Sequence, residues 1–175
     1  MSYIQEMFGL EDKTVILTGG GGAIAGALAE AYLKAGANVA LWDIKLEFAE
    51  TAAERLSAAA GDSGKILPVE VDAMSEDSVG SALEKTFSQF GSIDVLVNAA
   101  GGNRGKGPFV ETDVALFESI VRLNLVAGLL VPTKVTAAWW IANKKKGSII
   151  NLASMSSYIP LSGVWAYDAA KAGVL

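Results

Sequence analysis

The sequence predicts an α/β fold in which helices cover both faces of a doubly wound parallel sheet. Short apolar runs alternate along the chain with longer segments rich in Ala, Leu, Glu and Lys. That alternation is typical of parallel strands joined by crossover helices. Hydrophobic residues make up 51% of the 175-residue chain and charged residues 19%, a composition that suits one folded domain over residues 1–175.

Each element follows from a local pattern. The apolar runs predict strands at residues 14–18, 38–42, 65–71, 93–98 and 148–152. The segments between them predict helices at residues 23–35, 46–60, 75–90 and 113–142. Gly36, Gly91 and Gly147 stand where glycines commonly end helices, so each is expected to terminate one.

Composition and charge exclude several classes of function. The net charge of -5 and the pI of about 4.8 leave little attraction for nucleic acid. The chain has no His and no Cys, so we expect neither a thiol nucleophile nor a metal site. The apolar stretch 119–142 contains Arg122, Asn124 and Lys134, which argues against a membrane span, and residues 1–6 do not resemble a secretory signal. We expect a cytoplasmic protein with a small-molecule substrate.

A glycine-rich turn follows the first strand and opens the first helix. It contains Thr18, Gly19, Gly20, Gly21, Gly22, Ala23 and Ile24. Glycines let such a turn bend tightly and approach a pyrophosphate, which then lies at the N-terminus of the helix. Gly20, Gly22 and Ala25 fit the spacing G-x-G-x-x-A, so the turn indicates the dinucleotide site of a Rossmann-type fold.

Polar and small residues follow the next three strands. Asp43 would accept hydrogen bonds from the adenosine ribose and repel a 2′-phosphate, which favours NAD over NADP, although Lys45 keeps NADP open. Alternatively, Asp43 is an ordinary acid at the end of a strand. Asp72 could contact adenine or be an ordinary loop acid. The turn after the fourth strand contains Asn98, Ala99, Ala100 and Gly101, whose small side chains would let a flat cofactor press against the sheet.

A tyrosine and a lysine near the end of the chain carry the candidate chemistry. Tyr167 and Lys171 lie one turn apart on one helical face, where an ammonium makes a phenol acidic enough for proton transfer. Ser154 could hold a carbonyl or hydroxyl opposite them. Asn124 lies in an apolar helix, and burying an unsatisfied amide costs about 1 to 3 kcal/mol, so a functional role explains it best.

In this order and spacing, the motifs resemble the short-chain dehydrogenase/reductase family. The resemblance implies that Tyr167 exchanges a proton with the substrate oxygen and that Lys171 binds the nicotinamide ribose and lowers the tyrosine pKa. It also implies that Ser154 positions the substrate oxygen, that Asn124 holds a water of the proton relay, and that Tyr167 and Lys171 both contact the cofactor. The activity it implies is NAD-dependent hydride transfer to or from a secondary alcohol or ketone, by a homotetramer.

The sequence also departs from the family pattern. Ala23 and Ala25 replace the last two glycines of the turn, and Ala99 replaces an asparagine. The chain stops four residues after Lys171, whereas the resemblance implies two more strands, a substrate lid and a C-terminal helix. We therefore expect these 175 residues to be a truncated or incomplete form of such a protein.

The remaining loops suggest a substrate class. Asn103, Arg104 and Lys106 could attract a hydroxylated, anionic substrate, or could belong to a solvated loop without such a role. Segments 130–133 and 154–161 resemble sugar-acid oxidoreductases of the mannonate/fructuronate type. The predicted substrate is a polyol, sugar or sugar acid. The alternatives are a sugar-nucleotide epimerase or dehydratase that retains NAD, and an NAD-binding module without catalysis.

Overall fold

The computed structural model describes residues 7–60 and 65–175. Its strands are β1 (Thr14–Thr18), β2 (Asn38–Asp43), β3 (Ile66–Glu70), β4 (Val95–Asn98) and β5 (Ser148–Asn151). Its α-helices are α2 (Ala23–Lys34), α3 (Leu46–Ala60), α4 (Glu76–Phe90), α5 (Val114–Val121), α6 (Val131–Ala142) and α7 (Trp165–Ala172). The 3-10 turns η1 and η3 cover Phe109–Glu111 and Met155–Ser157, and a π-helix, η2, covers Arg122–Leu130.

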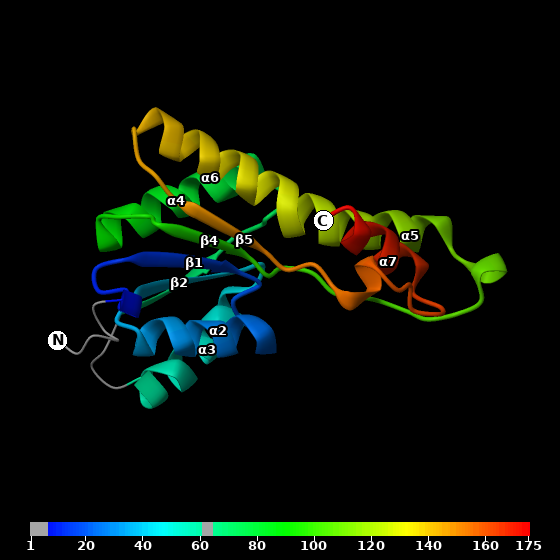
Figure 1. Cartoon of the computed structure of the whole chain (residues 1–175), viewed down its shortest axis with the longest axis horizontal. Coiled ribbons are helices and arrows are strands. Elements are labelled where there is room, and N and C mark those ends of the chain that lie inside the picture. Colours follow the sequence, from blue (N-terminus) through cyan, green and yellow to red (C-terminus); the bar gives the residue numbers. More distant parts are fainter. Residues whose placement is uncertain (1–6, 61–64) are drawn as a thin grey trace.

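The five strands form one parallel sheet in the order β3-β2-β1-β4-β5. Helices α2 and α3 cover one face, and α4 and the α5–α6 run cover the other (Figure 1). The change of winding direction falls between β1 and β4, where the strand order reverses. The predicted doubly wound, Rossmann-type α/β fold is therefore confirmed, and the carboxyl ends of all five strands lie along one edge.

Alternate residues of β1 separate the interior into two layers. Val15 and Leu17 belong to the cluster under α2 and α3, whereas Ile16 belongs to the cluster under α4 and α6. Both clusters consist of buried apolar side chains, whose removal from water provides most of the stability of such a fold. Ala25 is 1% exposed and packs in the first cluster. Its methyl group therefore fits against the sheet, where the family pattern has a glycine.

The long helix predicted over residues 113–142 is divided into three segments. Between α5 and α6 lies the π-helix, whose turn is one residue wider. Pro132 has no N–H for the helical ladder, and the Asn124 side chain donates to the Ile120 carbonyl at 2.9 Å. A Cβ built on Gly128 would lie 2.6 Å from the Ala100 carbonyl oxygen, so the helix passes close to the turn after β4.

By its length of 29 residues and its apolar composition, the run Val114–Ala142 could cross a membrane. In the structure, this run packs against α4 and β4, and it contributes Val131 and Trp140 to the second core cluster. The prediction from the sequence that this run does not span a membrane stays a prediction.

Two of the three predicted helix-ending glycines are confirmed. Gly36 and Gly91 have φ values of +91° and +78°, the left-handed conformation that glycine adopts most readily. The prediction for Gly147 is wrong, because α6 already ends at Ala142. A Cβ on Gly147 would lie 2.1 Å from the Trp140 ring, so this glycine makes room for a buried indole.

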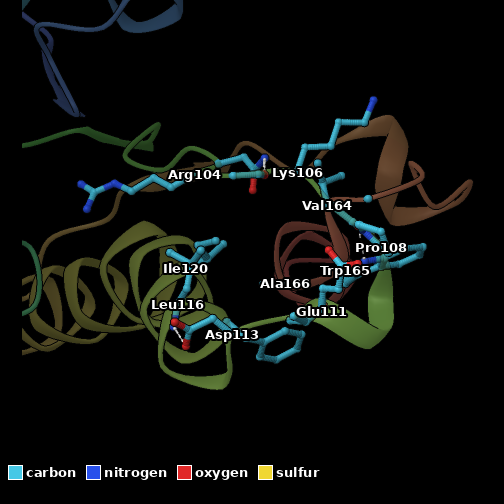
Figure 2. Close-up of a pocket in the computed structure, with 16 residues that line it drawn as sticks. Arg104, Lys106, Pro108, Glu111, Asp113, Leu116, Ile120, Val164, Trp165 and Ala166 are labelled. Atoms are coloured by element: carbon cyan, nitrogen blue, oxygen red, sulfur yellow. Dashed lines mark hydrogen bonds between the residues drawn. The ribbon is translucent and has the colours of Figure 1, made fainter.

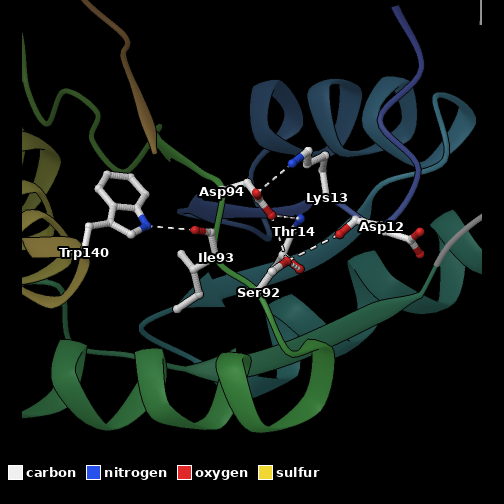
Figure 3. Close-up of polar contacts among 7 residues, drawn as sticks. All are labelled: Asp12, Lys13, Thr14, Ser92, Ile93, Asp94 and Trp140. Atoms are coloured by element: carbon white, nitrogen blue, oxygen red, sulfur yellow. Dashed lines mark hydrogen bonds and ion pairs between the residues drawn. The ribbon is translucent and has the colours of Figure 1, made fainter. Parts of the chain in front are cut away.

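Asp94 ties the amino ends of β1 and β4 together (Figure 3). Its carboxylate accepts hydrogen bonds from the Thr14 N–H at 2.9 Å and the Ser92 hydroxyl at 2.7 Å, and it pairs with the Lys13 ammonium at 3.1 Å. Burial raises the pKa of Asp94, but these three partners outweigh burial and hold that pKa below its usual range. This end of the sheet is therefore fixed far from the carboxyl edge.

Replacing Asp94 with Asn is expected to lower the free energy of unfolding by about 1 to 2 kcal/mol at neutral pH. A carboxylate with a depressed pKa stabilises the fold above its unfolded pKa of about 4 and loses this contribution as the pH falls through the folded value. The difference between wild type and Asp94→Asn, measured by urea denaturation, should therefore shrink in acid. The control is Asp12→Asn, an exposed carboxylate in the turn before β1. An equal effect of both variants would contradict the assignment.

Candidate active site

Thr18 holds the turn after β4 against the end of β1. Its hydroxyl oxygen accepts hydrogen bonds from the N–H groups of Ala99 and Ala100, each at 3.0 Å. Gly19 follows with a φ of +65°, and a Cβ there would lie 3.0 Å from the Cα atom of Ala100. The two turns therefore lie in contact, which requires a residue without a side chain at position 19.

The glycine turn leads directly into the N-terminus of α2. A Cβ on Gly20 would lie 2.8 Å from the Leu41 side chain, so the turn lies flat across β2. Gly22 is the N-cap of α2, no side chain caps the helix, and its first turn has no acidic residue. Ala23 and Ile24 are exposed there. Uncapped N–H groups and the helix dipole make this end suitable for a phosphate group.

Asp43 stands at the end of β2 beside this turn. It is 9% exposed, and its two oxygens accept the N–H groups of Gly21 at 3.0 Å and Lys45 at 3.3 Å. Each oxygen of a carboxylate can accept a second hydrogen bond, so Asp43 keeps acceptor capacity for a ligand. The Lys45 ammonium lies 5.0 Å from the centroid of the Phe48 ring. This lysine is not part of the cavity wall described next.

A cavity of about 380 Å³, here called the Asp43 cavity, lies at the carboxyl edge of the sheet. Its wall includes Asp43, Asp72, Gly101, Arg104 and Leu123. Asp72 is exposed, and its carboxylate accepts the Met74 N–H at 2.9 Å. In open α/β sheets, ligands bind at this edge next to the change of winding direction. Asp43 and Asp72 therefore border the same cavity, at the edge of the sheet where a ligand is expected.

Asn124 is completely buried in the π-helix and fixes the loop after β4. Its Oδ1 accepts the Gly102 N–H at 2.9 Å, and its Nδ2 donates to the carbonyls of Gly102 at 2.7 Å and Ile120 at 2.9 Å. A Cβ on Gly101 would lie 2.6 Å from Asn124 Oδ1. Every polar atom of this amide therefore serves the loop, which accounts for a buried amide in an apolar helix.

Lys171 and Tyr167 lie on α7, as the spacing predicts. Lys171 is 6% exposed, its Nζ donates to the Leu152 carbonyl at 2.7 Å, and it lies 5.9 Å from the centroid of the Tyr167 ring. Burial lowers the pKa of Lys171. A Cβ on Gly101 would lie 3.5 Å from this Nζ. The ammonium therefore lies between the turn after β4 and the half-buried tyrosine.

Ser154 begins the η3 turn with its hydroxyl directed by its neighbours. Its Oγ accepts the Ser156 N–H at 3.1 Å and lies 3.1 Å from the Ser156 hydroxyl. With Ser156 as the donor in both contacts, the Ser154 O–H is left to donate to a ligand. The Ser157 hydroxyl accepts the Ser154 N–H at 3.3 Å and donates to the Lys171 carbonyl at 2.7 Å. The serine turn is thereby joined to α7.

The structure places the side chain of Asn98 away from the Asp43 cavity, although the sequence suggested a cofactor contact. Asn98 is 1% exposed, and its Nδ2 donates at 2.8 Å to both Thr133 Oγ1 and Asn151 Oδ1. Because Thr133 is on α6 and Asn151 is on β5, the Asn98 amide links both elements to the end of β4. The amide of Asn98 thus supports the turn at residues 99–101 from behind.

Sequence reasoning assigned no individual role to Ser156, Ser157 or Gly102. The two serines follow Ser154 in a Ser-x-Ser-Ser pattern, and the spacing from Ser154 to Ser157 is that of a capping box, which the structure contains. That pattern could have predicted the local turn. Nothing near Gly102 in the sequence signals its double hydrogen bond with Asn124, because the two residues meet only through the fold.

An α/β fold with a tyrosine–lysine helix at the carboxyl edge of its sheet defines a class of oxidoreductase domains. The chain belongs to the short chain dehydrogenase family, whose sequence profile matches residues 13–175. Relatives include a sorbitol dehydrogenase from Cereibacter sphaeroides, 33% identical over 166 residues, and a D-threitol dehydrogenase from Mycolicibacterium smegmatis, 33% identical over 168 residues. The alignments cover 95% and 96% of this chain.

Solved structures agree with this assignment. A Haemophilus influenzae protein, provisionally described as a D-mannonate oxidoreductase and solved with NAD, superposes with a TM-score of 0.84 at 29% identity, over 98% of this chain and 65% of that one. A xylitol dehydrogenase solved with NAD⁺ gives a TM-score of 0.84 at 25% identity, over 94% of this chain and 62% of that one. The chain spans 62% of the length of the sorbitol and threitol dehydrogenases.

Proposed function

We propose that the protein to which this chain belongs is an NAD-dependent oxidoreductase acting on a secondary alcohol or ketone of a polyol, sugar or sugar acid. The observation that carries this proposal is the position of Lys171, whose ammonium lies beside the Tyr167 ring and the Gly101 turn at the rim of the Asp43 cavity. Relatives named sorbitol, threitol and xylitol dehydrogenase support the polyol class.

The residues present fit NAD. The uncapped N-terminus of α2 suits the pyrophosphate, and Asp43 has acceptor capacity for both hydroxyls of the adenosine ribose. A carboxylate at that position repels a 2′-phosphate, and the Lys45 ammonium lies on the Phe48 ring. When bound, NAD supplies a nicotinamide ring that accepts or returns a hydride.

The residues of this chain handle the substrate oxygen. In the oxidation direction, the Tyr167 oxygen takes the hydroxyl proton as the hydride leaves the adjacent carbon, and in reduction it returns that proton. The Lys171 ammonium lies 5.9 Å from the centre of the Tyr167 ring and so places a positive charge beside it. The Ser154 O–H donates to the same substrate oxygen, and Asn124 keeps the Gly102 loop in place.

The direct test is NADH formation by the full-length protein with sorbitol, xylitol, D-threitol and D-mannonate in turn. Turnover of at least one of them, with release of NADH, supports the proposal. An epimerase or dehydratase would instead retain the cofactor through purification and change a sugar nucleotide without net NADH release. A protein that binds NAD but turns over none of these substrates would contradict the proposed substrate class.

Replacing Asp43 with Ala is expected to reduce the preference for NAD over NADP. Each hydrogen bond to a charged group contributes about 1.5 to 3 kcal/mol, so losing even one should weaken NAD binding at least about tenfold. Binding of NADP should improve, because the repulsion of its 2′-phosphate is removed. The measurement is kcat/KM with both cofactors, and Asp77→Ala, an exposed acid on α4, is the control. Unchanged discrimination would remove Asp43 from the ribose contact.

A further inference from the structure

Arg104 lies at the boundary of two cavities. It borders the Asp43 cavity, and it also borders a second cavity of about 270 Å³ whose wall includes Asp113, Leu116 and Trp165, here called the Trp165 cavity. In Figure 2, the guanidinium extends away from the Trp165 side, whereas the Lys106 side chain leaves the loop at its other end. Arg104 and Lys106 both border the Trp165 cavity, but of the two only Arg104 borders the Asp43 cavity.

The backbone beneath Arg104 is held on both sides. Before it, Gly102 makes two hydrogen bonds with the buried Asn124 side chain. Across it, the Asn103 amide donates to the Gly105 carbonyl at 2.8 Å, closing a short turn with Arg104 between its ends. Although the Arg104 side chain is exposed, its starting point is therefore fixed relative to the cavity.

The guanidinium of Arg104 makes no ion pair within residues 7–60 and 65–175. The two carboxylates of the cavity wall accept backbone N–H groups, Asp43 those of Gly21 and Lys45 and Asp72 that of Met74, and neither pairs with Arg104. Because Arg104 pairs with neither acid of this wall, its guanidinium is available to a ligand in the Asp43 cavity.

The cavity itself indicates which part of a dinucleotide would meet Arg104. Of the glycine turn, Thr18 and Gly19 border it, but residues 20–25, which lead into α2, do not, so a pyrophosphate at the N-terminus of α2 would lie outside the cavity. The wall instead combines Asp43 and Asp72 with the apolar side chains of Leu123 and Ala127. Hydroxyl acceptors beside apolar side chains suit a ribose and a purine ring.

We propose that Arg104 stacks its planar guanidinium on the adenine of the cofactor, opposite Leu123, and so provides a second adenosine contact besides Asp43. The inference rests on the proposed use of NAD. A guanidinium stacks on aromatic rings because it is planar and weakly hydrated, which an ammonium is not. Neither Ser154 nor Tyr167 borders the two cavities that Arg104 borders, so this placement favours the cofactor over an anionic substrate as its ligand.

The test is the dissociation constant of ADP-ribose, measured by isothermal titration calorimetry on the full-length protein. Arg104→Gln should weaken binding by about three- to tenfold, whereas Lys106→Gln, in the same loop but outside the Asp43 cavity, should leave it unchanged. Equal affinity of Arg104→Gln and wild type would overturn the proposal while leaving NAD use intact. A wild-type protein that does not bind ADP-ribose would overturn the proposed function as well.

Arg104→Lys separates stacking from simple charge attraction. It keeps the positive charge and removes the planar group, so it should bind ADP-ribose almost as weakly as Arg104→Gln. Full recovery by lysine would overturn the stacking contact. Adenosine, which has no phosphate, should show the same order of affinities among wild type and the two variants, and an effect confined to ADP-ribose would also count against stacking.

Discussion

Replacement of Tyr167 with Phe is expected to lower kcat by roughly 10²- to 10⁴-fold, the usual contribution of a positioned acid/base group. The variant keeps the aromatic ring beside the Lys171 ammonium and removes only the hydroxyl that carries the proton. Since the fold and the Asp43 cavity are untouched, the dissociation constant for NAD should stay within about twofold of wild type.

Steady-state rates and calorimetric NAD binding measure these two effects separately. Tyr158→Phe is the matched control, because Tyr158 lies just beyond the serine turn, is 72% exposed and borders neither the Asp43 cavity nor the Trp165 cavity. We expect it to retain wild-type kcat. Wild-type turnover by Tyr167→Phe would refute the acid/base role, and equal losses in both variants would indicate a general structural effect.

Replacement of Asn124 with Ala should lower the free energy of unfolding by about 2 to 4 kcal/mol, because it leaves several buried backbone groups without partners. The groups are the N–H and the carbonyl of Gly102 and the carbonyl of Ile120. Since Gly102 anchors the loop that carries Arg104, ADP-ribose affinity should fall together with stability.

Urea denaturation and calorimetry measure the two effects of Asn124→Ala. Asn143→Ala provides the control, since Asn143 also donates to a helix carbonyl, that of Trp139 at 2.9 Å, but is exposed to water. Its loss should cost well below about 1 kcal/mol. Comparable destabilisation by the two variants would show that burial of the Asn124 network contributes little.

Much of the fold and the site is predictable because the carboxyl ends of parallel strands all lie at the same edge of the sheet. Once β1, β2 and β4 are recognised, the residues that follow them must share one edge, which brings the Gly19 turn, Asp43 and Gly101 together. The pairing of Tyr167 with Lys171 is equally local, since it depends only on the helical repeat. These predictions need the order of the elements but no detail of their packing.

Other features depend on contacts between distant segments. The π-helix arises where Asn124 meets Gly102 and where Gly128 passes Ala100, neither of which the local sequence reveals. The sequence around Gly147 is typical of a helix end, but in the structure this glycine is needed because the Trp140 ring packs against it. The Asn98 side chain faces Thr133 and Asn151 rather than the cavity for the same reason. Such side chains are interpreted correctly only when the packed neighbour is known.

Lys171 is bonded at both ends to the segment that follows β5, through its ammonium to Leu152 and through its carbonyl to Ser157. These two hydrogen bonds hold α7 at the side-chain and the main-chain end of Lys171. A rotation of α7 about its axis would therefore break both of them. Tyr167 and Lys171, one turn apart on α7, are therefore held in a fixed position relative to the serine turn. Loosening either link should therefore shift Ser154, Tyr167 and Lys171 together and not one at a time.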